Sequence, residues 1–158
     1  MPASERKRVL RMVPYGLYVI TCRSDEGTNA FTGSWLTQCS FHPPLVAIGV
    51  NREHRGGPMI RESGRFAVSF LKREQQDIAR HFLRPWKVTE EKFEGIAMSQ
   101  SPAGLPVLAQ GLAYLECEVR DLSEVGDHTL FIGEVTHACL QAEGPPLLMS
   151  DTKWSYGG

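Results

Sequence analysis

The chain has 158 residues, of which 42% are hydrophobic and 22% charged, proportions typical of a globular protein with one domain. Seventeen lysines and arginines against eighteen aspartates and glutamates leave a formal net charge of -1, which gives no reason to expect nucleic acid or an anionic membrane as partner. The sequence holds no apolar run of about 18 residues, the length that a membrane-spanning helix needs. The basic residues near its start are not followed by the apolar stretch of a signal peptide. We therefore expect a single domain over 1–158, located in the cytoplasm.

The first third of the chain carries the signals of a short helix, a β-hairpin and an extended segment. Serine is a favourable helix N-cap, runs of β-branched and aromatic residues favour strands, and an Asp-Glu-Gly tripeptide favours a turn. A residue before proline is pushed out of the helical region. The expected elements are a helix over 4–12 capped by Ser4, a strand over 17–22, a turn at 25–27, a partner strand from about Asn29 and an extended segment over 40–44.

The rest of the chain predicts further strands with two short helices between them. Compact apolar runs are typical of core strands, and apolar residues that recur on one helical face indicate a helix. The expected elements are strands over 45–50 and 66–71, helices over 58–63 and 74–83, an irregular stretch over 84–111, and long strands over 112–122 and 129–140 joined by a tight turn at 126–127.

This order of elements is mainly β. A doubly wound sheet needs a helix after nearly every strand, and the sequence offers too few helices for one. The pattern favours an antiparallel β-barrel, which closes on itself and so removes exposed sheet edges, with short peripheral helices. The two long strands each have one polar end, which suggests that a second subunit packs alongside them.

Cysteine and histidine usage gives no indication of a metal site. The four cysteines form no Cys-x-x-Cys pair, and each lies in or beside an apolar stretch, where a free cysteine behaves as a small hydrophobe. We expect buried thiols at Cys22, Cys39, Cys117 and Cys139. The five histidines lack the spacing of metal ligands, so we expect no bound metal.

The densest polar cluster runs from Asn29 to Ser40 and interleaves hydroxyl and amide side chains with Phe31 and Trp35. A flat heteroaromatic ligand needs this mixture, because its ring requires apolar faces and its edge requires donors and acceptors. Gly33 permits close approach of the backbone. A polar hairpin with solvated hydroxyls is the simpler interpretation, since serine and threonine favour turns.

Two further segments are candidate site residues. The loop 51–58 places two arginines, a histidine and two glycines before a predicted helix, which suits an anion because backbone N–H groups and fixed cations converge there. A charged surface loop is the alternative interpretation. His128 opens a long apolar strand after a Gly-Asp turn, where a packed structural histidine is also common.

Taken together, these segments resemble the flavin reductase-like family of FMN-binding split barrels. The order and spacing are similar over about residues 14–148, and the ending 151–158 is similar to the branch that includes flavoredoxin-like proteins. The resemblance implies a split β-barrel that binds FMN, or less often FAD, at the interface of a homodimer. The segments that carry it are Asn29–Trp35, Gln38–Ala47, Ile60–Leu71 and Gly126–Val135.

The resemblance also implies roles for individual residues. The flavin is expected to lie against a wall that begins in the 29–35 segment, with its phosphate at the 51–55 loop and the nicotinamide near His128. This chain has Gly56-Gly57 where many relatives have serine or threonine, so backbone N–H groups are expected to take over that contact. The expected flavin-binding residues are Asn29, Ala30, Phe31, Thr32, Ser34, Trp35, Gln38, Cys39, Ser40, Asn51, Arg52, His54 and Arg55, and His128 is expected to orient the nicotinamide.

The activity that the resemblance implies is hydride transfer from NAD(P)H to FMN, with reduced flavin or electrons passing to an acceptor such as a partner monooxygenase. The two cofactors carry that chemistry, so no acid–base dyad or nucleophile is needed. Two alternatives remain open: an FMN-containing electron carrier reduced by a protein donor, and a non-catalytic split-barrel protein that binds flavin or haem.

Overall fold

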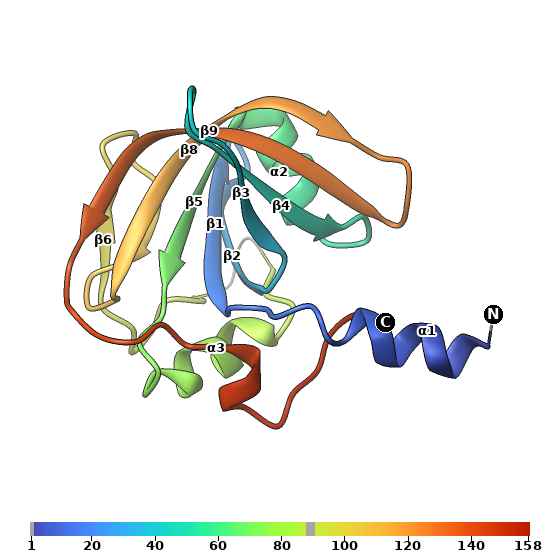
Figure 1. The fold of residues 1–158 in the computed structure, drawn as a ribbon. Coiled ribbons are helices and arrows are strands. Elements are labelled where there is room, and N and C mark those ends of the chain that lie inside the picture. The colour runs from blue at the N-terminus through green and yellow to red at the C-terminus, as the bar shows by residue number, and fades with distance from the viewer. Residues whose placement is uncertain (1, 88–90) are drawn as a thin grey trace.

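The fold is built on a curved antiparallel sheet. A computed structural model describes residues 2–87 and 91–158, and within them seven strands form one sheet in the order β2-β1-β5-β8-β9-β4-β3. Only Ser34 and Trp35 separate β2 from β3, although these strands are the two edges of the sheet. The sheet must therefore curl until its edges meet, as Figure 1 shows. The strands are β1 (Tyr18–Ser24), β2 (Gly27–Gly33), β3 (Leu36–Ser40), β4 (Leu45–Asn51), β5 (Arg65–Phe70), β8 (Ala113–Ser123) and β9 (His128–Leu140).

This architecture confirms the predicted mainly β split barrel with short helices at its periphery. Four short helices accompany the sheet within the described residues, and Figure 1 shows α1 projecting away from the barrel while α3 lies below it. None of the described helices is both long and apolar enough to cross a membrane. The helices are α1 (Ala3–Leu10), α2 (Gly56–Ser63), α3 (Gln76–Leu83) and the 3-10 helix η1 (Met149–Asp151).

Two apolar clusters bury opposite faces of the hairpin β1–β2. Ile20 and Phe31 are register partners and face the barrel interior, where Met59 and Ile60 of α2 join them. The alternate residues, such as Val19, face a second cluster under α3. Because successive side chains on a strand point to opposite faces, this double burial explains why four successive residues of β1, from Val19 to Cys22, are all buried.

Several sequence predictions need correction in detail. Ser4 is not the cap of α1, because the helix begins at Ala3 after Pro2 and Ser4 lies inside it. Residues 41–44 form a turn, not an extended segment, because the chain must reverse there between the antiparallel strands β3 and β4. The His42–Pro43 peptide bond in that turn is cis. The helix predicted over 58–63 begins at Gly56, and the helix predicted over 74–83 begins at Gln76.

The stretch 84–111 is not wholly irregular, since β6 (Met98–Gln100) pairs with β7 (Pro106–Leu108). Strands this short give too few alternating positions to be recognised in the sequence. The cysteines also differ among themselves: Cys22 and Cys117 are buried as expected, Cys139 is half-buried and Cys39 is exposed. Cys39 is exposed because β3 is an edge strand whose polar residues face outwards.

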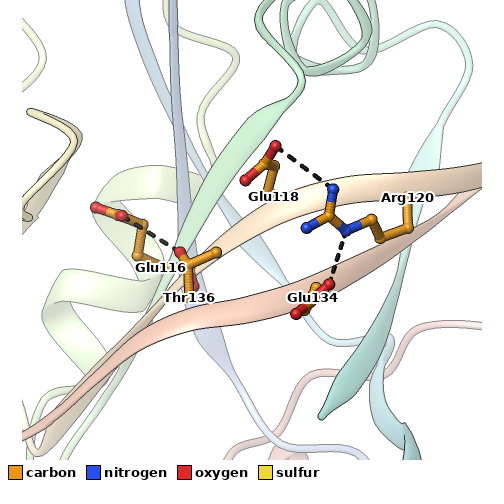
Figure 2. A network of polar contacts seen from close by, with 5 residues as sticks. All are labelled: Glu116, Glu118, Arg120, Glu134 and Thr136. Atoms are coloured by element: carbon orange, nitrogen blue, oxygen red, sulfur yellow. Dashed lines mark hydrogen bonds and ion pairs between the residues drawn. The ribbon is translucent and has the colours of Figure 1, made fainter. Parts of the chain in front are cut away.

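The long strands β8 and β9 carry their own charge compensation. Figure 2 shows Arg120 between Glu118 and Glu134, with Glu116 and Thr136 in contact further along the same two strands. Arg120 Nε donates to Glu134 Oε2 at 2.7 Å, and its Nη1 lies 3.5 Å from Glu118 Oε1. Exposed pairs of this kind contribute little to stability, because water and salt screen them. These charged side chains of β8 and β9 therefore find their ion-pair partners within one chain.

Candidate functional site

A cavity of about 400 Å³ lies between one side of the barrel and the segment 149–156. Its volume is within the range of small-molecule and cofactor sites, about 300–1,000 Å³. The barrel forms one wall of the cavity. The end of α3 and the chain's final segment form the opposite wall. The lining side chains used below are Phe31, Thr32, Ser34, Trp35, Asn51 and His54 from the barrel, Phe82 and Leu83 from α3, and Trp154, Ser155 and Tyr156 from the final segment.

The indole of Trp35 is the centre of the barrel wall. It lies over β4 at Gly49, where a Cβ atom would come within 2.8 Å of the indole Cε3, so glycine is what allows this close approach. The backbone holds the same arrangement, because Gly49 N–H donates to the carbonyl of Trp35 at 3.0 Å. The indole Nε1 is buried without a hydrogen-bond partner among the described residues. A buried donor without a partner is rare in folded proteins, and an acceptor on a bound molecule would supply the missing hydrogen bond.

His128 lies behind this wall and is joined to the final segment. Its ring centroid is 4.3 Å from that of Trp35. Nδ1 is 2.7 Å from Asp127 Oδ1, and Nε2 is 2.6 Å from the Tyr156 hydroxyl. The hydrogen bond with His128 lowers the pKa of Asp127, while burial raises the pKa of Tyr156. The carboxylate is therefore ionised and the phenol protonated at neutral pH.

His54 is a neutral residue of the cavity, not a cation. Burial lowers its pKa from the usual 6.5. Its Nδ1 accepts the Gly56 N–H at 3.0 Å, and its ring lies 4.3 Å from Phe31. One of the free N–H groups at the start of α2 is thereby already satisfied, which makes that helix end a weaker anion site.

The two arginines of the predicted phosphate loop do not line the cavity. Arg52 Nη1 donates to the carbonyl of Gly126 at 3.2 Å and borders a separate hollow with Gly57 and Arg61. Arg55 is exposed and lies 3.5 Å from Glu26.

The other predicted residues divide into two groups. Asn29 and Ala30 are buried within the fold, and Asn29 Oδ1 accepts the N–H of Ala30 at 2.9 Å. Gln38, Cys39 and Ser40 lie along the edge strand β3, away from the cavity. The structure thus brings six of the predicted residues to the cavity: Phe31, Thr32, Ser34, Trp35, Asn51 and His54.

Sequence reasoning missed the final segment as part of the site. Trp154 and Tyr156 are two aromatic residues within the polar, glycine-rich stretch 151–158. Large aromatic residues in such a segment are the signal in the sequence, because they are expected in a polar segment mainly where they pack against the rest of the fold. The Tyr156 ring meets Trp35 edge to face at 5.2 Å.

Residues 10–157 match the model of the family described as flavin reductase like domain. The chain belongs to this family. A flavin reductase of Pseudomonas putida is 30% identical over 154 residues, which cover 96% of this chain and 87% of that protein.

Solved structures of other flavin reductases have the same fold. The NADH:FAD oxidoreductase SgcE6 of Streptomyces globisporus is similar with a TM-score of 0.85 and 31% identity, over 94% of this chain and 88% of that one. A second structure of that protein is a complex with NAD and FAD fragments. BorF, the flavin reductase component of a bacterial two-component tryptophan halogenase, is similar with a TM-score of 0.83 and 25% identity over 98% of both chains.

Other curated relatives are much longer. The diflavin flavoprotein A 1 of Synechocystis is 31% identical over 143 residues, which cover 89% of this chain but 25% of that protein. The chain thus spans about a quarter of the length of the diflavin flavoproteins that it matches.

The cavity suits the flavin that a flavin reductase domain uses. Phe31, Trp35 and Trp154 supply apolar faces of the size of a fused ring. The unpartnered Trp35 N–H supplies a donor for a carbonyl or nitrogen acceptor at the edge of that ring. Both requirements of a flat heteroaromatic ligand are therefore met by residues of this chain.

Proposed function

We propose that this protein is an NAD(P)H:flavin oxidoreductase that binds FMN, or FAD as the second choice, in the cavity between the barrel and the final segment. The observation that carries the proposal is the aromatic cavity with the buried, unpartnered indole N–H of Trp35. A site for a small aliphatic substrate has no use for that combination, whereas an isoalloxazine has both a wide apolar face and a polar edge.

A bound flavin supplies the N5 atom that accepts a hydride from nicotinamide C4, which is chemistry that the two cofactors carry between them. The protein must hold both rings in contact, and fixed positions convert an encounter into a unimolecular step. Phe31 and Trp35 present the rigid surfaces for this, since both side chains are held on the barrel. The segment 154–156 covers the cavity and limits the access of water.

The residues around the cavity also stabilise charge. A reduced flavin would carry additional negative charge, and hydrogen-bond donors of the protein would be sufficient to stabilise it. Trp35 Nε1 is one such donor, and the neutral ring of His54 offers a second through Nε2–H, because its Nδ1 already accepts from Gly56.

The second candidate is an electron carrier that keeps its flavin bound and receives electrons from a protein donor. The similarity to diflavin flavoproteins favours it, because there the matching part is about a quarter of a larger protein. Reduction by free NAD(P)H distinguishes the two functions, since a carrier of this kind needs its donor protein.

The proposal extends to a homodimer and to an acceptor enzyme. All eight residues of α1 are exposed in the single chain, and the exposed apolar side chains of Val9, Leu10, Met12 and Val13 follow along and after it. This exposed apolar surface supports a dimer in which a second copy of the chain covers it. The similarity to the reductase component BorF supports an acceptor enzyme that consumes reduced flavin. An activity that draws on the NAD(P)H pool supports a cytoplasmic location.

The experiment is steady-state oxidation of NADH and of NADPH by the purified chain, with FMN, FAD or riboflavin as the second substrate. We expect turnover that saturates in both nucleotide and flavin. Substituting Ser155→Trp, an exposed residue at the cavity, should fill the space and abolish turnover, whereas Ser99→Trp on exposed β6 should leave it unchanged. Equal activity of both variants would place the reaction outside this cavity.

A further inference from the structure

The hydroxyl of Tyr156 is the meeting point of a polar network at the cavity. Asn51 at the end of β4 and His128 at the start of β9 are register partners across the sheet. Tyr156 reaches this pair from the final segment: its hydroxyl lies 2.6 Å from His128 Nε2, and its ring lines the same cavity as Asn51. The hydrogen bond to His128 thus fixes the position of the Tyr156 oxygen beside the cavity.

The direction of each hydrogen bond follows from the chemistry of the groups. An ionised carboxylate only accepts, so Asp127 fixes the proton of His128 on Nδ1. With that proton on Nδ1, the Nε2 atom is the acceptor of the Tyr156 O–H.

His128 has no ring nitrogen left for a ligand. Both of its nitrogens are engaged by residues of this chain, and its side chain is 15% exposed. Tyr156, in contrast, lines the cavity and is 41% exposed. Its oxygen donates its proton to His128 and keeps its lone pairs, which makes it a fixed acceptor for an N–H donor in the cavity.

We propose that Tyr156 binds the carboxamide N–H of the nicotinamide nucleotide, and that His128 and Asp127 are positioning residues that hold its hydroxyl for this contact. The inference rests on the proposed function, because it assigns the nucleotide to the same cavity. It differs from the direct contact by His128 expected from the sequence, since His128 now acts through Tyr156.

A purely structural latch is the competing role. If the Tyr156–His128 bond merely holds the final segment closed, its loss should loosen the whole cavity and weaken flavin and nucleotide together. If Tyr156 binds the carboxamide, the loss should fall on the nucleotide alone. Tyr156→Phe separates these outcomes, because it keeps the ring that packs on Trp35 and removes the oxygen.

The test uses the flavin-loaded protein and two measurements for each variant. Unreactive NAD+ is titrated while the flavin fluorescence is recorded, and anaerobic reduction by NADH is followed by stopped flow. For Tyr156→Phe we expect the Kd for NAD+ and the KM for NADH to rise about five- to thirtyfold, the effect of one lost hydrogen bond. The limiting reduction rate should stay within about twofold, and the Kd for FMN should be unchanged.

Two comparisons complete the design. Tyr114→Phe removes a phenol that also lies beside a histidine, His137, with ring centroids 5.8 Å apart and outside the cavity; it should bind NAD+ as the unaltered protein does. His128→Gln keeps an acceptor near the position of Nε2 and should recover most of the NAD+ affinity that His128→Leu loses.

Each outcome decides between the two proposals. Unchanged NAD+ affinity in Tyr156→Phe, or an equal loss of flavin and NAD+ affinity with a lowered melting temperature, overturns the role of Tyr156 while the proposed function stands. If the unaltered protein neither binds NAD+ nor accepts hydride from NADH or NADPH, the proposed function fails and this inference fails with it.

Discussion

Trp35 can occupy its place in the cavity wall because the residue beneath it, Gly49, has no side chain. Contacts of this kind limit how far the role of a single residue can be predicted from the sequence. Phe31 and Trp35, which the sequence interleaves with hydroxyl residues, line the cavity. Asn29 and Ala30, which are also expected from the sequence to bind flavin, are buried within the fold. A motif gives the order of residues along a strand, but the barrel's curvature decides which of them reach a cavity.

Tyr156 illustrates the opposite limit. Its hydrogen-bond partner His128 lies 28 residues earlier in the chain, and the residues that neighbour Tyr156 in the sequence do not reveal this contact. A prediction of this residue needed the path of the final segment over the barrel, which follows from packing between distant elements.

His54 makes the stability of the protein depend on pH. Its pKa is lowered by burial, so the unfolded chain takes up more protons than the folded one as the pH falls below about 6.5. The free energy of unfolding should therefore decrease as the pH falls from about 6.5. His54→Asn keeps a side-chain acceptor for the Gly56 N–H but cannot titrate, so this decrease should become smaller. Urea unfolding between pH 5 and 8 measures it.

The control is His42→Asn, which alters a histidine in the exposed turn 41–44 and should keep the acid-dependent decrease. An unaltered slope in His54→Asn would show that other groups cause the pH dependence.

The sequence predicts that Arg52 binds the flavin phosphate, and this role needs its own test because Arg52 does not line the cavity. The residue follows Asn51, which lines the cavity, and its guanidinium is held by the carbonyl of Gly126. We expect Arg52→Ala to weaken FMN binding about tenfold to a hundredfold, because a charge-assisted contact to phosphate contributes about 1.5–3 kcal/mol. Riboflavin has no phosphate and should bind within about twofold of its original affinity. Fluorescence titration of both ligands measures this.

Arg55→Ala is the matched variant, since Arg55 is paired with Glu26 at the surface. Equal losses of FMN and riboflavin in Arg52→Ala would move the phosphate elsewhere, and a selective loss in Arg55→Ala would identify that residue as its ligand.

At the level of elements, Gly133 in β9 limits the size of the side chain that the core of the barrel can accommodate between β4 and β8. A Cβ at Gly133 of β9 would lie 2.7 Å from two ring carbons of Phe66 and 2.9 Å from the Cβ of Cys117. We expect Gly133→Ala to lower the free energy of unfolding by about 1–3 kcal/mol, the usual effect of overpacking. Chemical denaturation measures the change.

Gly126→Ala is the control, because no described atom outside its chain neighbours lies within 4 Å of the added Cβ. It should change the free energy of unfolding by less than about 0.5 kcal/mol. Equal effects of the two variants would mean that backbone entropy, not crowding against Phe66, dominates at Gly133.

Long elements were predicted well and short ones poorly. The strands 112–122 and 129–140 agree with β8 and β9 to within one residue at each end, because many alternating positions support each of them. The pair β6–β7 has three residues per strand and escaped notice. The turn at 41–44 escaped as well, since the requirement to reverse the chain comes from the pairing of β3 with β4.

At the level of the whole molecule, the exposed helix α1 and the exposed apolar residues that follow it lead to a prediction about assembly. We expect a dimer when flavin is bound, because a second copy would cover the apolar residues around α1. Sedimentation with and without FMN measures this. A monomer that retains fully bound FMN would contradict it.

FMN should also raise the melting temperature. A ligand that binds only the folded protein adds about 2.7 kcal/mol at a hundredfold excess over Kd, which corresponds to roughly 5 to 10 °C for a domain of this size. Riboflavin should raise it less if the phosphate is bound. No shift at saturating FMN would argue against a native flavin site.

The most direct test of the account is the visible spectrum of the flavin-loaded protein when NADH or NADPH is added without oxygen. We predict that the absorbance band of oxidised flavin disappears, at a rate that saturates with nucleotide concentration, and that Ser155→Trp neither retains flavin nor supports this change. A band that persists with both nucleotides, yet disappears on adding a chemical reductant, would contradict the account and identify the protein as an electron carrier that needs a protein donor.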